Sequence, residues 1–117
     1  MDKKELSVQH ASELLKESGK LFAEVFKHGT LVVEFYKPEI LDLQGSHDKD
    51  EIYVIASGTG ILDKAGEKYN FKTGDFLFVP ANTAHWFEDF SEDFSTWVFF
   101  YGPVGGEKES EDNAGVL

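Results

Sequence analysis

The sequence predicts an all-β fold, an antiparallel sandwich or barrel preceded by one short helix. From residue 20 onward, short runs rich in Val, Ile, Phe, Tyr and Trp are separated by Gly, Pro, Asn and Asp. Such runs indicate strands joined by tight turns, and no strand–helix–strand alternation of the kind that builds a parallel sheet follows them. A chain of 117 residues with 41% hydrophobic residues suits one domain that buries its own core.

The first predicted element is a helix between Ser7 and Gly19. Val8, Ala11 and Leu15 recur at helical spacing between these two residues. Ser7 is a suitable N-cap, and Gly19 can take the left-handed conformation that ends many helices.

Eight strands follow, at residues 21–27, 30–37, 51–57, 60–63, 67–71, 75–79, 85–90 and 94–101. Gly29, Gly66 and Gly74 lie between consecutive strands and allow the positive φ of tight hairpins. We therefore divide the chain into a helical segment (1–19), one barrel domain (20–104) and an acidic tail (105–117) that we expect to be flexible.

Two of these strands are apolar on both faces. Tyr53 and Ile55 alternate with Ile52 and Val54, and residues 76–79 are all apolar. A lone antiparallel sheet usually leaves one face in water, so these strands indicate that the outer face is covered as well. The N-terminal segment or a second subunit would supply that cover. We expect a homodimer, with the aromatic residues of 97–101 in its core or interface.

Composition excludes several classes of function. Eleven Lys and Arg against 22 Asp and Glu give a net charge of −11, which disfavours nucleic acid as a partner. The chain has no cysteine, so thiolate metal sites and cysteine nucleophiles are excluded. Together with the lack of a secretory apolar segment, this predicts a cytoplasmic protein. No apolar run is long enough to cross a membrane, and no phosphate-binding loop or nucleophile elbow is present.

Three metal-competent side chains lie at the ends of predicted strands. His47 and Glu51 come from residues 45–51, and His85 ends the segment 74–85. Two imidazoles and one carboxylate can occupy one face of an octahedron around Fe, Mn, Ni or Zn, leaving other positions to water or substrate. The alternative is that His47 and Glu51 pair with each other and water, and that His85 is a core histidine.

The two segments resemble the cupins, a family of small β-barrels. The first cupin motif runs G(X)5HXH(X)3–4E(X)6G and the second G(X)5PXG(X)2H(X)3N. The matching residues are His47, Glu51 and Gly58 in the first motif and Gly74, Pro80 and His85 in the second. The resemblance implies a single-domain cupin barrel, an antiparallel double-stranded β-helix or jelly roll, whose metal ligands are His47, Glu51 and His85.

Three positions depart from these motifs. Gly45 replaces the first histidine, which leaves three of the four usual cupin ligands. Asn82 replaces a glycine, and asparagine tolerates the left-handed conformation well. Asp89 replaces the last asparagine. Gln44 lies beside the missing histidine and is a candidate ligand-binding residue.

Strand parity predicts the lining of the cavity. Tyr53 shares the face of Glu51, while Phe87 and Asp89 share the face of His85. We therefore expect Tyr53, Phe87 and Gln44 to contact a small molecule of mixed polarity, with Asp89 as an added carboxylate.

Two functions remain open from the sequence. The first is a metal-dependent enzyme of the dioxygenase or isomerase/lyase type that acts on a small organic molecule. The second is a non-catalytic barrel that binds a small ligand, with or without metal. The fold itself does not decide between them, and no catalytic residue is assigned.

Overall fold

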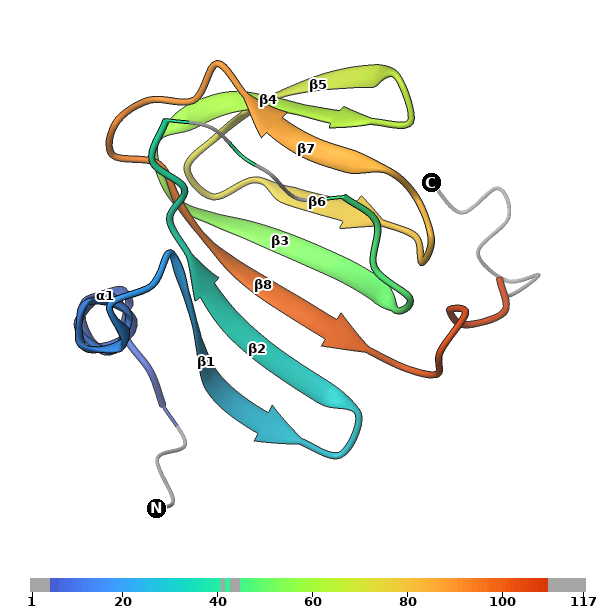
Figure 1. Ribbon diagram of the computed structural model, residues 1–117, viewed down its shortest axis with the longest axis horizontal. Helices are drawn as coiled ribbons and strands as arrows, with labels where there is room; N and C mark the ends of the chain where they lie inside the picture. The colour runs from blue at the N-terminus through green and yellow to red at the C-terminus, as the bar shows by residue number, and fades with distance from the viewer. Residues whose placement is uncertain (1–4, 41, 43–44, 110–117) are drawn as a thin grey trace.

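The computed structural model describes residues 5–40, 42 and 45–109, which form a jelly-roll β-barrel with one helix (Figure 1). The elements are α1 (Val8–Ser18), β1 (Phe22–His28), β2 (Leu31–Tyr36), β3 (Asp50–Ser57), β4 (Thr59–Lys64), β5 (Glu67–Lys72), β6 (Phe76–Val79), β7 (His85–Glu88) and β8 (Ser95–Tyr101). The predicted helix and each predicted strand are present, with ends shifted by at most about two residues, as is usual for strand limits. The predicted fold class is therefore confirmed.

Two antiparallel sheets face each other across the core. One has the order β1-β2-β8-β3-β6 and the other the order β5-β4-β7. Aromatic rings fill the space between them, and Phe87 makes edge contacts with Phe71, Tyr53 and Phe94 at 4.8–5.5 Å between ring centroids. This packing fixes β3 opposite β7, the two strands that carry Glu51 and His85.

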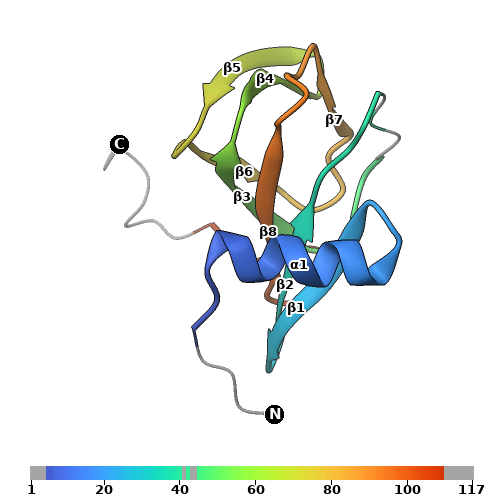
Figure 2. The ribbon, with the colours of Figure 1, turned by 90° about the vertical axis from the view of Figure 1, so that its left-hand side faces the viewer.

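Helix α1 lies against the outer face of the larger sheet (Figure 2). The Ser7 side chain accepts a hydrogen bond from the His10 N–H at 3.0 Å, and Gly19 ends the helix with φ 69°. Ala11 and Leu15 are buried against Phe35 of β2. The N-terminal segment thus covers part of the outer face, one of the two possibilities that the sequence left open. Within the described residues, no helix has the length and apolar character needed to cross a membrane.

The outer face of the five-stranded sheet carries two rows of apolar side chains. Strand pairing aligns Ala23, Phe35, Trp97, Val54 and Phe76 in one row, and Phe26, Val33, Phe99, Ile52 and Phe78 in the other. Helix α1 covers the first row near β1 and β2, whereas Phe76 and Phe78 are 64% and 39% exposed at the β6 edge. Part of this apolar face is therefore open in the single chain.

The beginning of the acidic tail is held against the loop that precedes β3. Gly105 N–H donates to the Asp48 carbonyl at 2.6 Å, and Glu107 N–H donates to the Asp50 carboxylate at 2.8 Å. Asp50 also accepts from Ala81 N–H at 2.9 Å, so it links the tail to the loop before β7. Residues 110–117 of the tail lie outside the described residues.

Candidate metal centre

The loop before β3 and the first residues of β3 and β7 bring His47, Glu51 and His85 together. His47 lies in the loop before β3, Glu51 is the second residue of β3, and His85 is the first residue of β7. The two loops are joined directly, because Asn82 N–H donates to the His47 carbonyl at 2.6 Å. Asn82 has φ 61°, the left-handed conformation that was predicted for it in place of the motif glycine.

The possible ligand atoms of these three side chains all lie within 4.8 Å of one another. His85 Nε2 is 3.0 Å from Glu51 Oε1, and His47 Nε2 is 3.9 Å from the same oxygen. The two imidazole rings are 5.2 Å apart between centroids. Glu51 and His85 are fully buried, whereas the His47 side chain is 34% exposed, so the group opens toward solvent on the side of His47.

A hydrogen bond to a backbone carbonyl fixes the orientation of the His85 ring. Its Nδ1 lies 2.8 Å from the Thr83 carbonyl, which can only accept, so Nδ1 carries the proton and donates. The other ring nitrogen, Nε2, faces Glu51 and lies 3.1 Å from the Tyr53 hydroxyl oxygen. Burial lowers the pKa of His85, but the nearby Glu51 carboxylate and the hydrogen bond to the Thr83 carbonyl outweigh it, so the pKa is raised overall. A histidine held by a backbone carbonyl in this way is typical of metal ligands.

The surroundings of the Glu51 carboxylate indicate whether these three residues suit a metal ion. Its side chain is fully buried, and neither carboxylate oxygen has a hydrogen-bond partner within the part of the chain that the structure describes. Burying a carboxylate without hydrogen bonds is costly, so such groups are found paired or bound to metal. Two imidazoles and one carboxylate suit a divalent ion, and the group is positioned to bind one.

The residues predicted to contact a ligand lie in three different environments. Tyr53 is fully buried, with its hydroxyl beside His85 Nε2. Phe87 is 2% exposed and packs its ring edge against Tyr53 in the core. Gln44 lies outside the described residues. Ligand contact by Tyr53, Phe87 or Gln44 therefore stays a prediction.

The prediction that Asp89 lines the cavity is wrong. Strand β7 ends at Glu88, and Asp89 follows it with φ 51° and an exposed side chain. The left-handed residue breaks the alternation on which the prediction was based.

A buried carboxylate that the sequence analysis missed lies behind the site. Asp42 is 6% exposed and accepts hydrogen bonds from the Tyr36 hydroxyl at 2.5 Å and from Phe87 N–H at 2.6 Å. It thus ties the loop between β2 and β3 to the strand that begins at His85. Burial and the hydrogen bond to Asp42 raise the pKa of Tyr36, which stays protonated as the donor. The sequence signal for this buried carboxylate is that Asp42 is the single acidic residue among the apolar residues of 40–43.

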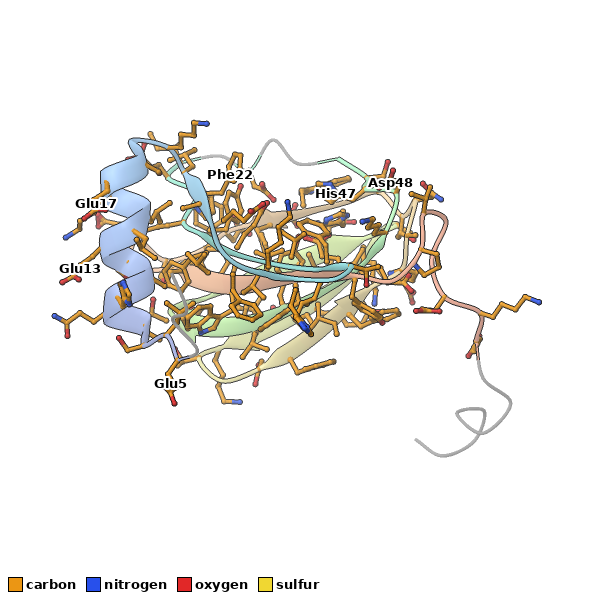
Figure 3. The ribbon with its side chains drawn as sticks, turned by 90° about the horizontal axis from the view of Figure 1, so that it is seen from below. Glu5, Glu13, Glu17, Phe22, His47 and Asp48 are labelled. Atoms are coloured by element: carbon orange, nitrogen blue, oxygen red, sulfur yellow. The ribbon has the colours of Figure 1, made fainter. Side chains whose placement is uncertain are left out.

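A cavity of about 270 Å³ opens beside His47 at the mouth of the barrel. Its lining residues are Phe22, Glu34, Tyr36, His47, Val98 and Phe100. Figure 3 shows Phe22 and His47 along the same side of the barrel. The His47 ring packs edge-on against Phe100 at 5.1 Å, so one candidate ligand forms part of the cavity wall. A molecule in this cavity would lie against the exposed side of the His–Glu–His group.

The protein is thus an antiparallel jelly-roll barrel with two imidazoles and a carboxylate gathered inside one end, where they are positioned to bind a metal ion. The family model described as a cupin domain matches residues 32–100, more than half of the chain. The protein belongs to the cupin family, and the family predicted from the two motifs is confirmed.

Two curated relatives share about half of the chain. It is 36% identical over 62 residues to an uncharacterized protein of Streptomyces coelicolor, a match covering 53% of this chain and 59% of that protein. It is 37% identical over 65 residues to an acireductone dioxygenase of Frankia alni, covering 51% of this chain and 32% of that protein. The chain thus matches less than two thirds of the length of either relative.

Solved structures share the fold at low identity. KdgF from a Halomonas species aligns with a TM-score of 0.60 at 19% identity, over 70% of this chain and 78% of that chain. A predicted oxalate decarboxylase from Thermotoga maritima aligns with a TM-score of 0.59 at 19% identity, over 68% and 77%. These similarities establish the barrel fold.

Proposed function

We propose that this cupin is a metal-dependent protein that acts on a small organic molecule held at the mouth of the barrel. The observation that carries the proposal is Glu51, a fully buried carboxylate without a hydrogen-bond partner among the described residues, which faces two imidazoles. The predicted reaction types are those of a dioxygenase or of an isomerase/lyase. The partial match to an acireductone dioxygenase supports this choice, although it covers only 32% of that protein.

His47, Glu51 and His85 would hold the ion, with Fe, Mn, Ni and Zn as the candidates. A divalent ion bound there would polarise a substrate oxygen and lower the pKa of a bound hydroxyl. The chain itself contributes three things. Thr83 fixes the His85 ring, the buried core keeps water from the inner side, and the cavity beside His47 admits the ligand. Tyr53 places a hydroxyl next to His85, where it can donate a hydrogen bond to a bound molecule.

The proposal predicts an ion with open coordination positions, because three side chains among the described residues would surround it. We expect bound Mn²⁺ to increase the relaxation rate of water protons several-fold over free Mn²⁺, since water exchanges at the open positions of a slowly tumbling complex. His47→Ala should abolish this enhancement, and His28→Ala, a change at the end of β1, should retain it. Binding of Mn²⁺ without enhancement would indicate a closed structural site. No binding of Mn²⁺ or Zn²⁺ would indicate a metal-free barrel that binds ligands without catalysis.

The predicted homodimer is a further part of the proposal, with a second copy of the chain covering the open apolar rows of the larger sheet. The ten residues of the two rows include no charged side chain, so two chains of net charge −11 can meet there without opposing carboxylates. We expect light scattering to give twice the 13.2 kDa chain mass. Phe76→Lys should give a monomer, and Tyr69→Lys on the smaller sheet should not. A monomeric wild type would refute the dimer. The cytoplasmic location also stays a prediction.

A further inference from the structure

One charged residue at the mouth of the barrel is not explained by the candidate metal centre. Glu34 lies in the middle of β2, and its strand partner Val98 and its neighbour Tyr36 both line the cavity beside His47. Glu34 lines the same cavity and is half-buried. Within the described residues, no hydrogen bond or ion pair of its carboxylate is found. A carboxylate in such a place reduces stability unless a ligand compensates for it.

The strand register makes a structural role for Glu34 implausible. Its direct cross-strand partner on β1 is Glu24, and like charges opposite each other destabilise a sheet. Glu24 has Lys27 at 3.9 Å, whereas no lysine or arginine is among the described residues that line the cavity beside Glu34. Burial, Glu51 and Glu24 together raise the pKa of Glu34. The carboxylates of Glu34 and Glu24, which face each other across the strand pair, make this end of the cavity negative and attract a positive charge.

The remaining walls of the cavity also suit a cation. Phe22, Tyr36 and Phe100 present aromatic rings, and Val98 completes an apolar surface. Aromatic faces attract ammonium-type cations, most strongly where water is partly excluded. The cavity volume of about 270 Å³ admits only a small molecule.

We propose that Glu34 is a specificity-determining residue, and that the cavity takes a small molecule with a substituted-ammonium group at Glu34 and an oxygen donor toward His47. The cation would rest among the aromatic rings with its charge balanced by the Glu34 carboxylate. This inference rests on the proposed function, because the oxygen end of the ligand is assigned to the metal centre. It narrows the substrate class from small organic molecules in general to small organic cations.

The test compares two probes of nearly equal shape. Choline carries a trimethylammonium group, and 3,3-dimethylbutan-1-ol replaces its nitrogen by carbon and is neutral. Binding of each is measured by NMR titration of the Zn²⁺-loaded and the metal-free protein. We expect wild type to bind choline at least about tenfold more tightly than the alcohol. Glu34→Gln should reduce this ratio several-fold without weakening alcohol binding, and Glu17→Gln on helix α1 should keep it (Figure 3).

Three results would overturn the inference: binding of neither probe, an equal affinity of wild type for both, or a preference for choline that is as large in Glu34→Gln as in wild type. If Glu34→Gln does not fold, Glu34→Asp serves instead, since a carboxylate one methylene shorter should lower the ratio several-fold and an unchanged ratio would refute the role. The metal content of each sample is measured separately. A wild type that takes up no Zn²⁺ yet prefers choline refutes the proposed function, whereas a Zn²⁺-loaded protein without the preference refutes this inference alone.

Discussion

Replacing Glu51 by methionine is expected to stabilise the metal-free protein while it abolishes metal binding. The Glu51 side chain is fully buried and both of its oxygens lack hydrogen bonds within the described residues. Methionine has a similar length and fills the same space without a charge. Removing a buried carboxylate that lacks hydrogen bonds relieves the cost of its desolvation, which we expect to stabilise the metal-free protein by about 1–3 kcal/mol. His85 would then be neutral and would keep its hydrogen bond to Thr83.

The measurement is urea unfolding at about pH 8 with a chelator and then with Zn²⁺, above the ordinary histidine pKa. Wild type should gain stability from Zn²⁺, and Glu51→Met should not, since binding to the native state alone is what stabilises. Glu92→Met changes an exposed glutamate and should alter the free energy of unfolding by less than about 0.5 kcal/mol. A metal-free Glu51→Met protein less stable than wild type would show that Glu51 and His85 form a structural pair.

Replacing Asp42 by alanine is expected to cost about 3 kcal/mol of stability, because it leaves two buried donors without an acceptor. These donors are the Tyr36 hydroxyl and the Phe87 N–H, at 2.5 and 2.6 Å from the two carboxylate oxygens. Phe87 lies two residues after His85 on β7, so the same change should also weaken Zn²⁺ binding by loosening the start of that strand.

Two further variants, measured by the same urea unfolding, test whether the loss of stability comes from the hydrogen bonds of Asp42. Asp42→Asn keeps one acceptor oxygen and should lose about half as much stability as Asp42→Ala. Asp48→Ala removes an exposed carboxylate from the same loop and should change stability by less than about 0.5 kcal/mol. A loss for Asp42→Ala no larger than for Asp48→Ala would refute the structural role of Asp42.

The elements of the fold could be predicted because their signals are local. Ser7 and Gly19 cap the helix as expected, and the glycine turns separate the strands at the predicted places. The orientation of side chains near β1 could not be predicted. A bulge between Glu24 and Phe26 shifts the register, so Glu24 pairs with Glu34 while Phe26 pairs with Val33 on the outer face. A bulge of this kind reverses which side chains along the strand face inward and which face outward, and no residue pattern in the sequence indicates it.

The candidate site could be predicted only in part, for the same reason. His47, Glu51 and His85 come from two motifs with fixed spacing, and the structure brings them together. Glu34 and Asp42 join the site through strand pairing and a loop crossing rather than through a motif. Each is a single acid among apolar residues, and that pattern identifies a buried carboxylate without saying what it faces.

The most direct test of the metal centre is elemental analysis of the purified, tag-free protein after loading with Fe²⁺, Mn²⁺, Ni²⁺ or Zn²⁺. We predict about one ion per chain in wild type, and its loss in His47→Ala and His85→Ala with the fold intact by circular dichroism. His10→Ala on helix α1 should retain the ion. A wild type that takes up none of these metals, or a folded His85→Ala protein that keeps its full metal content, would contradict the account.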